Sequence, residues 1–362
     1  MFKRDETRQV RVGNVLIGGG APVSIQSMTN TDTRDAAATV RQILELEEAG
    51  CEIVRVAVPD KEAAEAVSGI RKSIHVPLVC DIHFDYRLAL ECADRGADKI
   101  RINPGNIGRS EYVKLVTDKC RARNIPIRIG VNGGSLDREI LAKYGRATAD
   151  ALFESAAKHV KILESFDFED VVVSIKASDV LTTRRALELF ASSFRYPIHV
   201  GITEAGTVFG GTVKSCVGIG AIFSEGIGDT LRVSLTGDPV EEVRVARKAL
   251  KALGLSSAKM LEFTSCPTCG RTKVDLIGTA ERVENILEGF ERRKLFKAPV
   301  RVAVMGCGVN GPGEAREADI GMAGGDGFFL LFEKGEITGR IPEEDAAEAF
   351  VGIVREKYCR EG

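Results

Sequence analysis

The stretch from Glu52 to Asn103, EIVRVAVPDKEAAEAVSGIRKSIHVPLVCDIHFDYRLALECADRGADKIRIN, decides the fold of this chain. It contains three short runs rich in β-branched residues, at Glu52–Val58, Leu78–His83 and Lys99–Asn103, with an amphipathic segment of helical period after each of the first two. Strands that alternate with helices pair in parallel, because each helix carries the chain back to the starting edge of the sheet. The stretch therefore predicts two consecutive strand–helix–strand units.

The same alternation extends in both directions through the first 254 residues. Further strands are expected at Val23–Met28, Ile127–Val131, Val171–Lys176, Ile198–Thr203 and Leu231–Leu235. Helices are expected at Asp35–Glu48, Lys61–Ser73, Tyr86–Arg95, Ser110–Arg123, Asp179–Phe194 and Pro239–Leu253, with a pair broken at Gly145 and a glycine-rich helix over Gly210–Glu225. Eight strand–helix units in about 250 residues fit a (β/α)8 TIM-type barrel. An open doubly wound sheet is less favoured, because the turn at Thr29–Asp32 lacks a G-x-G-x-x-G pattern.

A second, smaller α+β module follows the barrel. Its pattern is a strand from Leu261, a cysteine pair, a helix at Thr279–Phe290, a strand at Val300–Val304, a glycine-rich loop, strands over Gly327–Glu333 and a final helix at Glu343–Lys357. The predicted domains are therefore a substrate-binding barrel over residues 1–254 and a metal-binding module over residues 261–362.

Composition and charge exclude several classes of function. The 50 basic and 52 acidic side chains leave a net charge of −2, so the chain as a whole presents no positive field for nucleic acid. No apolar run of about 18 residues is present, so no membrane-spanning helix is expected. The segment Met1–Glu6 lacks the apolar region of a signal peptide, so a cytoplasmic location is expected. In that reducing compartment the nine cysteines are core residues, catalytic groups or metal ligands rather than disulfides.

The sharpest local signal is the pair Cys266 and Cys269 in the segment CPTC, followed by Cys307 in the glycine-rich segment MGCGVNGPGE. Two thiolates separated by two residues on a tight turn can hold one metal ion or one edge of a cluster. Three cysteines leave one ligand position open, and the candidates for it are Glu314, Cys359 and Cys216. These residues alone leave both a structural zinc site and an iron–sulfur cluster open.

Polar side chains gather at the carboxyl ends of the predicted barrel strands, where barrel enzymes carry their active sites. In chain order they are Arg55, Asp81, His83, Arg101, Asn103, Arg128, Asn132, Lys176, Ser178, Glu204, Arg232 and Ser234. Four arginines and a lysine at one mouth repel one another unless an anion joins them, and arginine forks suit phosphate oxygens. We therefore expect a small, multiply anionic substrate, most simply a diphosphate, with His83, Lys176 and Glu204 as proton-transfer candidates.

Six segments carry a resemblance to a known family. They are VSIQSMTNTD (Val23–Asp32), RINPGNIG (Arg101–Gly108), GVNGGS (Gly130–Ser135), GITEAG (Gly201–Gly206), TSCPTCGRT (Thr264–Thr272) and MGCGVNGPGE (Met305–Glu314). Together they resemble the bacterial 4-hydroxy-3-methylbut-2-enyl diphosphate synthases of the methylerythritol phosphate route to isoprenoids. The resemblance runs from about Arg8 to about Tyr358, and it is to the short, two-domain form of the family.

This resemblance implies reductive ring opening and dehydroxylation of 2-C-methyl-D-erythritol 2,4-cyclodiphosphate by electrons that arrive one at a time. It also implies a [4Fe–4S] cluster held by Cys266, Cys269, Cys307 and Glu314, with flavodoxin or ferredoxin as electron donor. Two alternatives belong to other classes. One is a non-redox barrel enzyme of the dihydropteroate-synthase type with a structural zinc module, and the other is a non-catalytic iron–sulfur carrier, which leaves the polar barrel mouth unexplained.

The order of the two modules predicts how subunits assemble. Each barrel helix returns to the end opposite the active mouth, so the second module starts at the far end of its own barrel. The connection from Leu255 to Leu261 spans at most about 25 Å when fully extended, which makes a return to the mouth awkward. We therefore expect a head-to-tail homodimer in which each cluster module caps the partner's barrel mouth, giving two composite sites.

Overall fold

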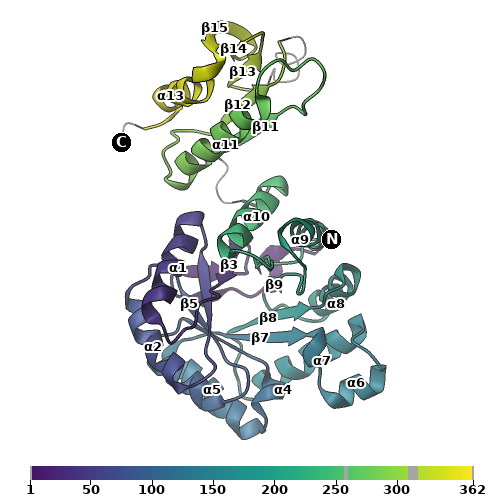
Figure 1. Ribbon diagram of the computed structural model, residues 1–362. Coiled ribbons are helices and arrows are strands. Elements are labelled where there is room, and N and C mark those ends of the chain that lie inside the picture. The colour runs from purple at the N-terminus through teal and green to yellow at the C-terminus, as the bar shows by residue number, and fades with distance from the viewer. Residues whose placement is uncertain (1, 257–259, 309–316, 361–362) are drawn as a thin grey trace. The chain divides into compact units, whose positions relative to one another are not determined.

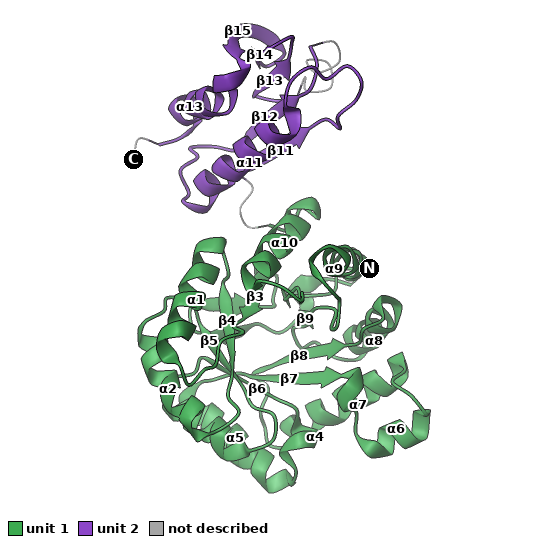
Figure 2. Ribbon diagram, in the orientation of Figure 1, with its two compact units in different colours: residues 1–257 green, residues 258–362 purple. Residues whose placement is uncertain are grey.

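The computed structural model describes residues 2–256, 260–308 and 317–360 of the chain. The chain divides into two compact units, residues 1–257 and residues 258–362, which are drawn in green and purple in Figure 2.

Eight parallel strands form the centre of the first unit. They are β3 (Ser24–Met28), β4 (Ile53–Ala57), β5 (Leu78–Asp81), β6 (Lys99–Ile102), β7 (Ile127–Asn132), β8 (Val171–Lys176), β9 (His199–Val200) and β10 (Thr230–Leu231). Their order in the sheet is β8-β7-β6-β5-β4-β3-β10-β9, and a parallel bridge between Val173 and Ile198 joins its two edges, so that the sheet nearly closes. The predicted TIM-type barrel is confirmed.

Helices surround this barrel (Figure 1). They are α1 (Ala36–Ala49), α2 (Lys61–Lys72), α3 (Tyr86–Asp94), α4 (Pro104–Ile107), α5 (Ser110–Arg123), α6 (Arg138–Tyr144), α7 (Ala149–Glu164), α8 (Val180–Ser193), α9 (Val208–Phe223) and α10 (Pro239–Ala252). Several begin directly after an aspartate whose side chain accepts a hydrogen bond from a first-turn N–H, as Asp60 does for α2 and Asp179 for α8. The break between α6 and α7 falls at Gly145, whose φ of +74° ends α6 in the left-handed conformation.

The barrel strands are apolar outside and polar inside. In β6, for example, Ile100 and Ile102 belong to the main core between strands and helices, whereas the alternate residues Lys99 and Arg101 point to the barrel interior. An N-terminal hairpin of β1 (Val10–Val12) and β2 (Val15–Ile17), which the sequence analysis did not predict, packs apolar side chains against Ile53 and Val79. It closes the barrel at the amino ends of the strands.

The second unit is a five-stranded sheet with helices packed against it. Its strands β11 (Leu261–Ser265), β12 (Val300–Met305) and β13 (Ile320–Gly324) are parallel, and β14 (Phe328–Glu333) and β15 (Glu336–Pro342) continue the sheet in antiparallel order. The helices α11 (Leu276–Arg292) and α13 (Ala346–Tyr358) pack against each other. Single 3-10 turns occur at Arg4–Glu6, Gly133–Ser135 and Glu343–Asp345. The strands β13 and β15 were not predicted from the sequence.

Candidate active site

A cavity of about 240 Å³ lies at the carboxyl ends of the barrel strands. Its lining residues are Met28, Arg55, Asp81, His83, Arg101, Arg128, Asn132, Ser174, Lys176, Thr203, Arg232 and Ser234. Nine of these twelve belong to the set expected from the strand ends, and the other three, Met28, Ser174 and Thr203, were missed. Strand alternation could have identified Ser174, because it lies two residues before Lys176 and so on the same face.

The parallel register brings the charged side chains to one level. Asp81 on β5 is opposite Arg101 on β6, and Arg101 is opposite Arg128 on β7. Since every strand alternates between its core face and its interior face, these three side chains point into the barrel together. The fold therefore places acidic and basic groups that are far apart in sequence on one wall of the cavity.

Asp81 is the carboxylate at the centre of this wall. Its oxygens lie 3.0 Å from Arg101 Nη1, 3.8 Å from Arg55 Nε and 3.5 Å from His83 Nε2. Burial opposes ionisation of Asp81, but Arg55, His83 and Arg101 hold its pKa well below the usual value. Asp81 is therefore an anion that orients two arginines, and it neutralises only part of their charge.

A second carboxylate, which the sequence analysis missed, orients Arg232. Glu242 on α10 is 4% exposed, and its two oxygens accept hydrogen bonds from Arg232 Nε and Nη2 at 3.1 Å each. It also accepts from the backbone N–H of Leu235 at 3.0 Å and from Ser27 Oγ at 3.2 Å. Because Glu242 comes from a helix rather than from a strand end, the barrel pattern gave no signal for it.

Two buried cations complete the excess of positive charge. Arg128 is 1% exposed, and its Nη1 donates a hydrogen bond of 3.4 Å to Gln26 Oε1. Lys176 is 8% exposed, and neither it nor Arg128 forms an ion pair within the described residues. Burial, together with neighbouring arginines, lowers the pKa of both groups well below their ordinary values. A cavity with this balance selects an anion.

Three residues of the expected set do not line the cavity. Asn103 is buried and its side chain accepts a hydrogen bond from Gly105 N at 3.1 Å, which caps α4. Ser178 is exposed beyond β8. Glu204 is exposed one residue after the lining residue Thr203, and its φ of +52° is unusual for a residue with a side chain. Contacts of these three residues with a substrate stay predictions.

Two cysteines of the second unit, Cys266 and Cys307, lie at the carboxyl ends of two adjacent strands. Cys266 follows β11 and Cys307 follows β12 after one residue, and these parallel strands pair residue by residue from Leu261 to Ser265. The backbone N–H of Gly306 donates a hydrogen bond of 3.2 Å to Cys266 Sγ. Cys269 is exposed on the same turn, where hydrogen bonds, chiefly with the backbone of Arg271, lower its pKa and favour the thiolate.

The structure describes two of the three candidates for a fourth ligand, Cys359 and Cys216. Cys359 is buried, and its backbone bridges Phe296, which precedes β12, so it lies at the end of the sheet opposite Cys266 and Cys307. Cys216 is half-buried on α9 of the barrel unit, and burial raises the pKa of both Cys216 and Cys359. Glu314 lies outside the described residues.

Three thiols at this edge of the sheet are compatible with a single metal ion and with a cluster. Among residues 2–256, 260–308 and 317–360, no three histidine, cysteine or carboxylate side chains gather closely enough to hold one metal ion. In a [4Fe–4S] cluster each thiolate binds a different iron, so the ligands need not converge on one point. The Gly306 N–H at Cys266 Sγ is also the kind of donor that tunes the potential of cluster sulfurs.

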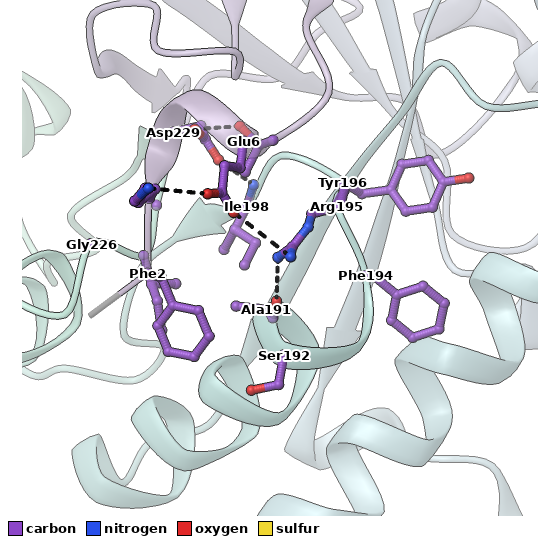
Figure 3. A pocket seen from close by; sticks show the side chains of 14 residues that line it. Phe2, Glu6, Ala191, Ser192, Phe194, Arg195, Tyr196, Ile198, Gly226 and Asp229 are labelled. Atoms are coloured by element: carbon purple, nitrogen blue, oxygen red, sulfur yellow. Dashed lines mark hydrogen bonds and ion pairs between the residues drawn. The ribbon is translucent and has the colours of Figure 1, made fainter.

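A larger cavity, of about 280 Å³, lies at the other end of the barrel (Figure 3). Its polar groups already have partners. Arg195 faces Glu6 at 3.7 Å, and the buried Asp229 accepts hydrogen bonds from Ile198 N and Thr7 Oγ1. Burial raises the pKa of Asp229 to about 6. These contacts hold the N-terminal segment against the barrel. The cavity lies far from the carboxyl ends of the strands, where barrel enzymes carry their active sites, so we do not assign the active site to it.

Comparison with known protein families gives matches to both units. Residues 7–247 match the GcpE TIM-barrel domain, and residues 262–356 match the GcpE protein C-terminal domain. A "4-hydroxy-3-methylbut-2-en-1-yl diphosphate synthase (flavodoxin)" of Lysinibacillus sphaericus is 58% identical over 345 residues, which cover 95% of this chain and 91% of that protein. The protein of the same name from Clostridium perfringens is 57% identical, over 98% of this chain and 99% of its own length.

Solved structures of other enzymes share the barrel only. A 3-dehydroquinate dehydratase from Geobacillus kaustophilus superposes with a TM-score of 0.51 at 13% identity, covering 71% of this chain and all of its own. A dihydropteroate synthase from Yersinia pestis gives 0.50 at 11% identity, covering 68% of this chain and 99% of its own. At such low identity these likenesses concern the fold alone. Within the described part of the chain, no helix combines the length and the apolar character needed to cross a bilayer.

Proposed function

The chain belongs to the GcpE family of 4-hydroxy-3-methylbut-2-en-1-yl diphosphate synthases, and from this premise we propose that it catalyses the reductive ring opening and dehydroxylation of 2-C-methyl-D-erythritol 2,4-cyclodiphosphate. The product is 4-hydroxy-3-methylbut-2-enyl diphosphate, formed with uptake of two electrons and two protons and loss of one water. The observation that carries the proposal is the excess of buried cations in the barrel cavity, because a cyclic diphosphate supplies the anion that these groups require.

The barrel side chains divide into binding and proton-transfer groups. Arg55, Arg101, Arg128 and Arg232 bind the phosphate oxygens, with Asp81 and Glu242 orienting three of them. The uncharged polar residues Asn103, Asn132, Ser178 and Ser234 are proposed to contribute further hydrogen bonds to the substrate. His83, Lys176 and Glu204 are the groups proposed to move protons as the ring opens and the hydroxyl leaves.

The cofactor proposal is a [4Fe–4S] cluster held by Cys266, Cys269, Cys307 and Glu314. When bound, the cluster would supply single electrons for cleavage of the carbon–oxygen bond. The meeting of Cys266 and Cys307 at neighbouring strand ends, and the distance of Cys359 from that edge, support this ligand set. The names of the relatives, which include flavodoxin, support flavodoxin as the electron donor, with ferredoxin as the other candidate. The cytoplasmic location is part of the same proposal.

The quaternary proposal is a head-to-tail homodimer in which each second unit completes the partner's barrel. A stripe on α9 supports contact with a second copy of this chain. Phe209 is 83% exposed, Val213 51% and Val217 59%, and their spacing of four residues places them on one face of the helix. An uncharged stripe is self-complementary across a two-fold axis, so an identical copy is the partner that fits it most simply.

Anaerobic purification followed by metal analysis tests the cofactor part of this proposal. The expected result is a brown protein that contains iron and sulfide. A colourless protein with one zinc per chain would instead favour a non-redox barrel enzyme with a structural zinc module. A barrel of the dihydropteroate-synthase type has no further support here, because that likeness is at 11% identity.

Replacement of Glu314 by alanine is expected to leave much of the iron in place and to abolish turnover. Three thiolates would still hold the cluster, but the fourth iron would lose its carboxylate. A carboxylate binds iron less tenaciously than a thiolate, so in the unmodified protein a substrate oxygen could displace it. Iron and sulfide content and anaerobic activity are the measurements. Unchanged activity of E314A would contradict this ligand assignment.

Removal of the cavity arginines is expected to lower kcat/KM at least tenfold, since a charge-assisted hydrogen bond contributes about 1.5–3 kcal/mol. For Arg128→Met we also expect a melting temperature at or above that of the unmodified protein, because a buried cation without an ion-pair partner disappears. Arg185→Ala on the exposed face of α8 is the control and should change neither quantity. If all four cavity arginines prove neutral, the proposed substrate site is wrong.

A further inference from the structure

Lys99 lies beneath the substrate cavity and has no assigned role. It is the first residue of β6, it is fully buried, and its Nζ has no hydrogen-bond partner within the described residues. On the same strand Arg101 lines the cavity. Lys99 lies two residues before Arg101, so its side chain also points into the barrel interior, but nearer to the amino ends of the strands, which the N-terminal hairpin closes. It does not itself line the cavity.

Among the residues that the structure describes, the charged groups that act on Lys99 are both positive. Arg128 on β7 and Arg55 on β4 are the charged groups that act on it, and its cross-strand partner on β5 is the apolar Val79. His199 on β9 belongs to the same buried layer and is likewise influenced by Lys99 and Arg128. The adjacent Asp98 is engaged outside the barrel, where it pairs with Arg71 at 2.7 Å.

Burial and these two arginines lower the pKa of Lys99 well below its ordinary value, so its amine is disfavoured as a cation while the cavity holds no anion. A diphosphate in the cavity changes that balance. Its negative charge offsets Arg55 and Arg128 from the open side, and in a barrel interior of low dielectric the effect reaches the layer below. The charged form of Lys99 then becomes favourable.

We propose that Lys99 is a positioning residue that takes up one proton from solvent when an anionic substrate enters the cavity, and that the resulting ammonium draws the phosphates towards the barrel floor. No bond to the substrate is required, because the interaction is between charges across Arg128. The inference rests on the proposed function only in that the ligand is a multiply charged anion. Since the complex binds one proton more than the free protein, affinity for the anion must rise as the pH falls.

Titration calorimetry of the full chain with sulfate tests this inference, because sulfate is a dianion that does not itself titrate near neutral pH. Measurements in two buffers of different ionisation enthalpy give the number of protons taken up. We expect roughly one proton for the unmodified protein and a value near zero for Lys99→Met. We also expect Lys99→Met to weaken sulfate binding by roughly tenfold at neutral pH, because one positive charge that acts on the anion across Arg128, in a medium of intermediate dielectric, is lost.

The matched control is Lys72→Met, which removes an exposed lysine on α2 and should retain the full proton uptake. Uptake that persists in Lys99→Met would overturn the inference and assign the proton to another group, such as Lys176 or His199. Sulfate affinity of the unmodified protein that stays flat between pH 6 and 9 would overturn it without any variant. If sulfate binding shows Lys99-dependent uptake but the cyclodiphosphate gives no binding heat, Lys99 is supported and the proposed substrate fails.

Discussion

Glu204→Gln is expected to lower kcat by roughly 10²–10⁴ while leaving the iron and sulfide content unchanged, as loss of a general acid does. Glu204 is exposed and directly follows Thr203, which lines the cavity. Its left-handed backbone costs about 1 kcal/mol or more for a residue with a side chain. Glutamine keeps the shape and removes the ionisable proton.

Steady-state kinetics at saturating substrate measures this effect, with iron analysis of the same sample. Glu45→Gln, which removes an exposed carboxylate on α1, is the control and should behave as the unmodified protein. A change confined to KM would mean that Glu204 binds substrate without transferring a proton. Full activity of E204Q would show that Glu204 has no part in the reaction.

Mixing two inactive variants is expected to restore activity if the sites are shared between chains. In the proposed composite site, Glu204→Gln would damage the barrel half and Cys307→Ala would damage the cluster half. In a head-to-tail heterodimer of the two, one site carries both defects and the other carries neither. Random exchange makes half of the dimers mixed, each with one intact site of two, so about a quarter of the full activity should return.

The measurement is activity against mixing ratio, with mixed dimers verified by differently tagged chains. The control is each variant incubated alone under the same exchange conditions, which should stay inactive. Verified mixed dimers that remain as impaired as the parents would place both halves of the site in one chain. The composite-site proposal would then be wrong, whereas the ligand and substrate assignments would be unaffected.

The barrel could be predicted from the sequence because its strands are buried on their outer face and flanked by clear helix signals. Runs such as Val171–Lys176 and helices such as Ser110–Arg123 have in the structure the bounds that the pattern gives. The N-terminal hairpin was missed because its strands have three residues each, too short for a period to register. The strand β15 was missed because most of its side chains are exposed, so that its sequence shows no clear alternation of apolar and polar residues. In the structure, Lys334 and Gly335 precede β15 and both have the positive φ of a tight hairpin turn.

The lining of the candidate site was predictable where it depends on strand ends and not where it depends on tertiary contacts. Residues such as Arg101 and Asp81 follow from the rule that barrel chemistry lies at the carboxyl ends of strands. Glu242 could not be found this way, because its role arises from the packing of α10 against Arg232. Lys99 was not among the predicted residues, because it is the first residue of a strand, and conserved chemistry in barrels is expected at the carboxyl ends.

We propose that this chain reduces the cyclodiphosphate at a [4Fe–4S] cluster. An anaerobic assay of the full chain, with its cluster reconstituted and a strong one-electron reductant present, tests it most directly. We expect conversion of 2-C-methyl-D-erythritol 2,4-cyclodiphosphate to 4-hydroxy-3-methylbut-2-enyl diphosphate, with two electrons consumed for each product. Protein with full iron and sulfide content that leaves the cyclodiphosphate unchanged, with either this reductant or reduced flavodoxin, would contradict it.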